Sequence, residues 1–182
     1  MVLWIVLGVL GVVVLWVIAT YNGLIQLRIL TENSWSDIDV NLKKRHDLIP
    51  NLVNTVKGYA KHEQATLEKV IQARNQAVQA PNQESQMEAE SALSALIPKI
   101  FALAEAYPDL KANTQFLDLQ TQLTALESEI ANSRRYYNAV VRDFNTKQQL
   151  FPASLIAGMF GFSTKKFFEV EEAAKATPQV SF

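Results

Sequence analysis

The chain begins with a long apolar run. The segment MVLWIVLGVLGVVVLWVIATYNGLIQL contains no charged side chain before Arg28. An apolar run of this length is long enough to cross a bilayer as a single helix. We therefore predict a transmembrane helix over residues 2–23 and assign residues 1–23 to a membrane anchor. The anchor side chains expected at lipid or at the interface are Trp4, Leu7, Leu10, Val14, Trp16 and Tyr21.

After the anchor, the apolar positions recur with a helical period. Two series advance in steps of three and four residues, one from Trp35 to Tyr59 and one from Phe116 to Phe144, which is typical of helices that pack on other helices. No segment is typical of a strand, so we predict an all-α fold. The predicted bundle core is Trp35, Ile38, Leu42, Ile49, Leu52, Val56, Tyr59, Phe116, Leu119, Leu123, Leu126, Ile130, Tyr137, Val140 and Phe144.

Residues 24–151 form the predicted bundle. Helical runs are expected up to the region of Pro50, over residues 53–80, over residues 84–107, and from a capping Asn113 onwards. Short polar loops between such runs favour an elongated antiparallel bundle of about four long helices. Pro50 and Pro98 fall inside two of the runs, so we expect a kink or a local break at each.

The C-terminal tail, residues 152–182, differs in composition from the bundle. It begins with the apolar, glycine-spaced piece LIAGMFGF and becomes charged afterwards. This piece could cover the open end of the bundle core, contact a neighbouring subunit or lie against the membrane. The residues predicted for a membrane or interface contact are Leu155, Ile156, Met159, Phe160 and Phe162.

A cleaved signal peptide is the alternative to a permanent anchor. Val17-Ile18-Ala19 would suit a small-residue cleavage site, but a basic stretch before the apolar run is missing and the run is longer than usual. We expect the anchor to be retained. The nearby basic residues all follow the anchor, so the positive-inside tendency places the bundle in the cytoplasm, with a single span in the bacterial inner membrane.

Composition and motifs argue against several functional classes. The net charge is −1, so the chain has no general positive field to attract nucleic acid. It has no cysteine and only two histidines, and neither histidine belongs to the Glu-x-x-His or HExxH arrangements of helical metal sites. Glycine-rich phosphate loops and nucleophile turns are also missing from the sequence. We therefore expect no enzymatic activity, no metal and no cofactor.

The polar stretch ENSWSDIDVNLKKRHDLIPNL is dense enough in charged groups to suggest a reactive site. Glu32, Asp39 and His46 recur every seven residues, so on one helix they form a line with members about 10 Å apart. That spacing is too wide for three ligands of one metal. Asp39 and Lys43 stand four apart with the acid first, which favours a surface ion pair. The line is expected to face solvent or another helix.

Arg45 differs from the other charged residues because it occupies a position in the apolar series. A buried arginine requires partners, and a carboxylate on another helix, such as Asp143, would supply one. The candidates for a polar network or a subunit interface are Asp39, Lys43, Arg45, His46, Arg134, Arg142 and Asp143.

Several long segments resemble one family of bacterial membrane proteins. They are YNGLIQLRILTENSWSDIDVNLKKRHDLIPNLVNTVKGYAKHE, AEAYPDLKAN, RRYYNAVVRDFNTKQQLFP and the terminal FFE with Pro178 and Phe182. In this order they look like the LemA family. The resemblance implies one N-terminal membrane helix, an elongated helical bundle, and relatives in magnetosome-forming bacteria where a similar protein is tied to membrane invagination. It implies no catalytic residues, and nothing is carried over to residues 76–95.

These observations predict a self-assembling scaffold on the membrane. Its expected partners are the lipid bilayer and further copies of the same chain, and it would organise or bend the bilayer. The alternative is an adaptor that binds another membrane protein, such as a protease or a signalling protein. An undetected enzyme is the third class, which would require a water-filled pocket with converging polar groups.

Overall fold

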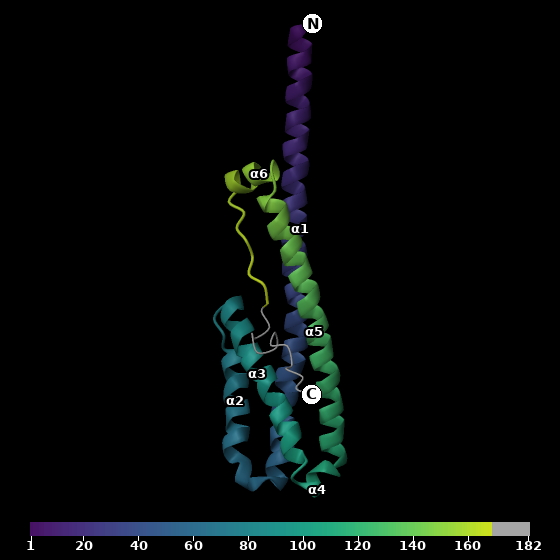
Figure 1. Cartoon of the computed structure of the whole chain (residues 1–182), viewed down its shortest axis with the longest axis vertical. Coiled ribbons are helices and arrows are strands. Elements are labelled where there is room, and N and C mark those ends of the chain that lie inside the picture. The colour runs from purple at the N-terminus through teal and green to yellow at the C-terminus, as the bar shows by residue number, and fades with distance from the viewer. Residues whose placement is uncertain (169–182) are drawn as a thin grey trace, which may run out of the picture. The chain divides into compact units, whose positions relative to one another are not determined.

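The computed structural model describes residues 1–168, and within that range every regular element is a helix. The elements are α1 (Val2–Tyr59), the 3-10 helix η1 (Lys61–Glu63), α2 (Gln64–Val78), α3 (Gln83–Ala104), α4 (Pro108–Lys111), α5 (Thr114–Gln149) and α6 (Ala153–Met159) (Figure 1). The predicted all-α bundle is confirmed. The part of the predicted tail from Glu169 to Phe182 lies outside the described residues.

The contacts divide the chain into two compact units, to which α1 and α5 both contribute. The anchor unit consists of residues 1–37 and 133–167. The bundle unit consists of residues 38–132, and Phe168 is the remaining described residue assigned to it. Its boundaries fall within α1, between residues 37 and 38, and within α5, between residues 132 and 133, whereas the predicted domains are 1–23, 24–151 and 152–182.

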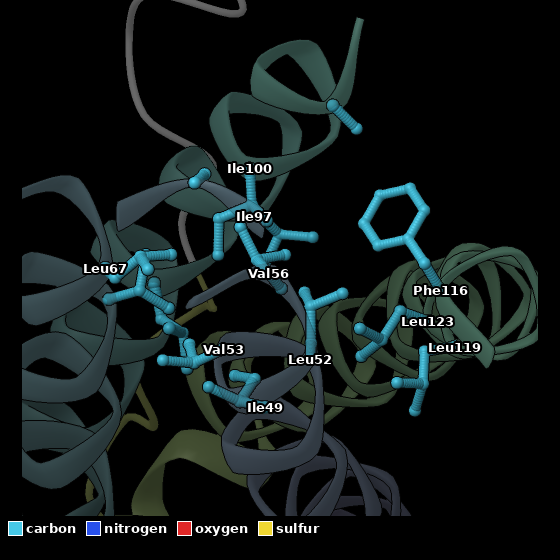
Figure 2. Close-up of a cluster of buried hydrophobic side chains, with 14 of the residues drawn as sticks. Ile49, Leu52, Val53, Val56, Leu67, Ile97, Ile100, Phe116, Leu119 and Leu123 are labelled. Atoms are coloured by element: carbon cyan, nitrogen blue, oxygen red, sulfur yellow. The ribbon is translucent and has the colours of Figure 1, made fainter. Parts of the chain in front are cut away.

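The bundle unit is built on an apolar core. Its segments of α1, α2, α3 and α5 each contribute side chains that recur every three or four residues, as Leu67, Val70, Ala73 and Ala77 do in α2. Figure 2 shows how the side chains of these segments converge. The cluster consists of Ile49, Leu52, Val53, Val56, Ala60, Leu67, Val70, Ala73, Ala77, Leu93, Ile97, Ile100, Ala104, Leu110, Phe116, Leu119 and Leu123.

Most of the predicted core positions are buried, and two are not. Trp35 is only half-buried, with its ring edge against Tyr137 at 5.5 Å between centroids. Tyr59 is 43% exposed because it is the last residue of α1, where its hydroxyl accepts a hydrogen bond from Asn113. The confirmed positions are Ile38, Leu42, Ile49, Leu52, Val56, Phe116, Leu119, Leu123, Leu126, Ile130, Tyr137, Val140 and Phe144.

Neither proline interrupts its helix. Pro50 lies inside α1 and Pro98 inside α3, so a local break at either proline is wrong, while the alternative of a kink stays a prediction. Proline has no N–H, and Pro50 therefore leaves the carbonyl of His46 without its usual helical donor. Arg74 of α2 supplies a donor instead, with Nε 3.2 Å from the His46 oxygen. A tertiary contact thus satisfies the carbonyl that the proline leaves open.

The chain instead turns ten residues after Pro50. The predicted run over residues 53–80 is divided at Ala60, whose φ of −111° and ψ of 63° are not helical, and η1 leads into α2. After this turn, the apolar face of α2 packs against the core residues of α1. Two asparagines start later helices as N-cap acceptors: Asn82 accepts from the Ser85 N–H and the predicted cap Asn113 from the Phe116 N–H, each at 2.9 Å.

In the anchor unit, the chain that follows α6 is fastened to α5. The side chain of Asn145 accepts from the Lys165 N–H and donates to the Lys165 carbonyl, both at 2.9 Å. Tyr137 donates its hydroxyl to the Lys166 carbonyl at 3.1 Å. These bonds hold an irregular segment whose own backbone would otherwise lack partners.

Candidate functional site

The first candidate site is the apolar start of α1. Among the described residues, this is the one helix that is long and apolar enough to cross a membrane, judged by length and composition. None of that apolar window is buried, whereas the core helix of a soluble protein would be mostly covered. The first fully buried residue of α1 is Leu24, immediately after the predicted span.

The predicted anchor side chains fall into two groups. Tyr21 is half-buried and contacts aromatic rings of the C-terminal segment. The others are exposed within the chain, as lipid-facing residues would be: Trp4, Leu7, Leu10, Val14 and Trp16. The predicted anchor therefore has an exposed part, which contains Trp4 to Trp16, and a packed C-terminal end at Tyr21.

The second candidate site is an apolar surface around α6, which we call the α6 surface. Its side chains are each between 55% and 80% exposed: Leu150, Phe151, Leu155, Met159 and Phe160. Ile156 and Ala157 point the other way and are buried, so the prediction that Ile156 makes an outward contact is wrong. A helical turn places residues 155 and 159 on one side and 156 on another.

Phe162 also departs from the prediction of an outward contact. It is half-buried, with its ring 5.9 Å from Tyr21 and 6.3 Å from Phe144, and the guanidinium carbon of Arg28 lies 5.7 Å from its centroid. Phe160 packs against Tyr21 at 4.7 Å while remaining half exposed. These contacts attach the α6 surface to the end of the anchor.

The third candidate site is a buried charge network in the bundle unit. Arg45 of α1 is fully buried and its Nη2 pairs with Glu90 Oε2 of α3. Its Nη1 donates to Glu127 Oε1 of α5 at 2.7 Å and to Ser94 Oγ at 2.6 Å. His46 Nε2 lies 2.7 Å from the other Glu90 oxygen. One arginine thus joins three helices.

The environment of Glu90 keeps it ionised. Burial alone raises the pKa of this carboxyl, but the hydrogen bond with His46 and the charge of Arg45 outweigh burial, so the pKa lies below its ordinary value. Arg45 Nε is buried without an acceptor among the described residues. The network is therefore strongly paired at its centre and has one donor left over.

The other candidates for the polar network lie elsewhere. Asp143 is not the partner of Arg45: it is exposed and pairs with the adjacent Arg142, 3.4 Å away. Asp39 accepts from Gln86 at 3.0 Å, and the expected ion pair with Lys43 does not form within the described residues. Arg134 is half-buried in the anchor unit. The partner of a long charged side chain depends on which helix faces it. Residue spacing along one helix does not reveal that helix.

Sequence reasoning missed Glu90, Ser94 and Glu127. A signal was present, because Glu90 stands three residues after Met87 and three before Leu93, both buried. Glu90 therefore occupies an apolar position of α3, as Arg45 does in α1. A buried acid and a buried base on different helices are candidates for an ion pair. Glu90 lies in residues 76–95, the least motif-like part of the sequence.

The side chains of the network contact one another and connect the helices that carry them. Both carboxylates are engaged by Arg45, and Ser94 lies between that guanidinium and Glu127, to which it donates at 3.4 Å. The arrangement therefore fits a specific packing role for α1, α3 and α5.

A groove of about 650 Å³ lies elsewhere in the bundle unit, between the end of α1 and α2. Its floor is mainly apolar, and Lys57, Lys61 and Glu68 are among its charged lining residues. The full lining is Pro50, Val53, Asn54, Lys57, Ala60, Lys61, Gln64, Leu67, Glu68, Ile71 and Gln72.

Comparison with known proteins gives consistent matches. A sequence profile of the LemA family matches residues 34–182. Protein LemA of Metamycoplasma hominis is 26% identical over 151 residues, which cover 82% of this chain and 69% of that protein. Magnetosome protein MamQ 2 of Paramagnetospirillum magneticum is 22% identical, covering 97% of this chain and 75% of that protein. Magnetosome protein MamQ of Magnetospirillum gryphiswaldense is 20% identical, covering 88% and 70%.

Proposed function

The chain belongs to the LemA family, and on this premise we propose that it is a single-pass membrane protein that self-associates as a scaffold. In this proposal it resides in the bacterial inner membrane, with the bundle unit in the cytoplasm. Copies pack side by side and organise or bend the bilayer. The proposal assigns the protein no catalytic reaction, in keeping with the structural role of the buried network.

The observation that carries the proposal is the start of α1. It is apolar, has no cover within the described part of the chain, and continues without interruption into the part of α1 that bears core residues of the bundle unit. One helix therefore contains both the lipid-facing and the protein-packed surface. An anchor of this kind fixes each copy to the membrane and confines copies to two dimensions, which raises their effective concentration.

The relatives support the membrane association in the proposal. Those named magnetosome proteins cover up to 97% of this chain, so the likeness includes the anchor as well as the bundle. Self-association and bilayer bending are not properties that identity at this level transfers, and each requires its own measurement.

Self-association is tested on the intact chain in detergent. We expect light scattering coupled to size exclusion to give a protein mass above that of one chain, rising with concentration. A mass of one chain at every concentration would contradict the scaffold.

Orientation is tested by labelling single cysteines, because the chain contains none of its own. Ser128→Cys lies at an exposed position in α5. In intact spheroplasts, a membrane-impermeant maleimide should leave it unlabelled until the cells are lysed. Labelling before lysis would place the bundle unit outside the cytoplasm.

The groove between α1 and α2 supports an adaptor as the second candidate. A mainly apolar groove of this size with charged residues at its lining suits a helix or peptide of another protein. Ile71 is half-buried and lines it. If the protein is an adaptor, one foreign membrane protein should copurify at fixed stoichiometry with the wild type and be lost from Ile71→Glu.

A further inference from the structure

The α6 surface has a composition that a water-facing segment would not be expected to have. Between Lys147 and Lys165 the chain has no charged side chain. Five of the apolar residues in this interval are largely exposed, and α6 is apolar on its outer as well as its inner side. A helix that is apolar all round is normally covered on all sides. Core packing explains Ile156 and Ala157 but leaves Leu155 and Met159 unexplained.

The position of this surface points to what covers it. Phe160 packs against Tyr21 at 4.7 Å, at the end of the segment of α1 that is exposed and apolar. Tyrosine and tryptophan gather where a span meets the headgroup layer. Figure 1 shows α6 beside α1, and Tyr21 and Phe160 belong to the same unit of the structure, so the α6 surface adjoins the exposed apolar segment of α1.

The charges around this surface complement a bilayer. Basic residues border the uncharged interval on both sides, Lys147 before it and Lys165 and Lys166 after it. Arg28 lies over the ring of Phe162 beside Tyr21. Basic side chains that flank an apolar face are typical of elements at an anionic membrane surface.

We propose that the α6 surface is a second lipid contact of this protein. It lies in the interfacial zone of the membrane that the anchor crosses, with Leu155, Met159 and Phe160 at the boundary between headgroups and acyl chains. The proposal rests on the anchor of the proposed function and is independent of self-association. Apolar side chains inserted into one leaflet only would give each copy a means of bending the bilayer.

Spin labels on single cysteines measure this contact directly in the full-length chain. Leu155→Cys and Met159→Cys report on the α6 surface, Val9→Cys is the reference in the anchor, and Ser128→Cys is the reference in the bundle unit. All four positions are exposed, so the label displaces no core side chain. Each variant is reconstituted at one copy per nanodisc of phosphatidylethanolamine and phosphatidylglycerol, and circular dichroism checks that its helix content is unchanged.

The readout compares collisions of each label with oxygen, which concentrates in lipid, and with a water-soluble nickel chelate. We expect the labels at positions 155 and 159 to collide less often with the chelate, and more often with oxygen, than the label at position 128. Their depth in the bilayer should be smaller than that of the label at position 9. If the labels at positions 155 and 159 collided with the chelate as often as the label at position 128, while the label at position 9 lay in lipid, the second lipid contact would be contradicted. The membrane anchor would still stand. Chelate access at position 9 would contradict the anchor itself.

A second copy of the chain is the competing occupant of the surface. A nanodisc with one copy contains no second chain. Reduced collision of the labels at positions 155 and 159 with the chelate in such a disc therefore identifies a contact with lipid. Protection that appears only in vesicles holding many copies would assign the α6 surface to a protein contact and overturn the lipid contact.

Discussion

At the scale of single residues, Arg45 and Glu90 are the two fully buried opposite charges of the bundle unit. Removing such charges from water is costly, and a buried pair is weak evidence for high stability. We infer that the pair contributes specificity, because apolar contacts alone discriminate weakly between neighbouring registers of α1 on α3. With His46 and Glu127 also engaged, a shifted register would leave buried charges unpaired.

Replacing one partner of this pair should be strongly destabilising. Arg45→Met leaves the Glu90 carboxylate buried beside Glu127 without its arginine, and we expect a loss of about 3 to 5 kcal/mol in the free energy of unfolding. Urea unfolding of the full chain in detergent, followed by circular dichroism, measures it.

The double variant Arg45→Met with Glu90→Leu serves as the matched control. Removing both charges avoids the unpaired carboxylate, so the double variant should recover most of the stability lost in Arg45→Met. If the double variant were less stable than the wild type by the sum of the losses measured for Arg45→Met and Glu90→Leu alone, Arg45 and Glu90 would not act as a pair.

The lowered pKa of Glu90 gives the stability a defined dependence on pH. The unfolded chain takes up the Glu90 proton at the ordinary pKa and the folded chain only at a lower pH. The stabilisation is therefore present above the ordinary pKa of glutamate, about 4.3, and is lost as the pH falls through the lowered folded pKa. Urea midpoints measured between pH 6 and pH 3 should show this loss.

Two variants distinguish Glu90 from the other carboxylates. Glu90→Gln should show a shallower loss on acidification, whereas Glu88→Gln, at an exposed position on the same helix, should retain the full loss. Equal slopes in the two variants would contradict the role given to Glu90.

Arg45 shows how far residue-level prediction reached. Its place among apolar positions suggested the hypothesis of a buried arginine with a carboxylate partner on another helix, and in the structure Arg45 is buried and paired with Glu90. The partner was not predicted, because spacing along α1 says nothing about which residue of α3 or α5 faces it. For the piece LIAGMFGF the sequence left core coverage and an outward contact open, and which of its residues turn inward, as Ile156 does, depends on packing that the sequence does not reveal.

At the scale of elements, the continuous helix through Pro50 depends on a neighbour. The His46 carbonyl accepts from Arg74 Nε at 3.2 Å in place of the missing helical bond. A net hydrogen bond is worth about 1 kcal/mol, and a buried acceptor left unsatisfied costs about 1 to 3 kcal/mol. We therefore expect Arg74→Met to destabilise the wild type by an amount in that range, measured by urea unfolding.

The same substitution in a Pro50→Ala background provides the test of mechanism. Replacing the proline by alanine restores a backbone N–H that can serve the His46 carbonyl, so Arg74→Met should cost less there than in the wild type. An equal cost in both backgrounds would mean that Arg74 acts through something other than this carbonyl.

Helix positions were more predictable than helix ends. The apolar period of α1 and α5 follows from geometry that any core-facing helix shares, and it identified most of the buried residues. The end of α1 at Tyr59 had no proline to mark it, and only Gly58 stands near it as a weak signal. Pro50 was the stronger local signal, yet a contact from α2 overrode it.

At the scale of the whole molecule, the anchor and the bundle should be separable. All of residues 1–23 belong to the anchor unit and none is fully buried, so removing them takes no side chain from the core of the bundle unit, although the contacts of Tyr21 with Phe160 and Phe162 are lost. We expect the truncated chain to retain helical circular dichroism and cooperative unfolding. It should also leave the membrane fraction on alkaline carbonate extraction, while the full chain stays in it. A truncated chain that failed to fold would contradict the assignment of residues 1–23 to a separate membrane anchor.

Native mass spectrometry of the chain released from membranes tests the central claim most directly, because one spectrum reports both the anchor and self-association. The account predicts multimers built from an intact 20.4 kDa subunit that retains residues 1–23. A subunit beginning at Thr20, or a monomer at every protein concentration, would contradict it.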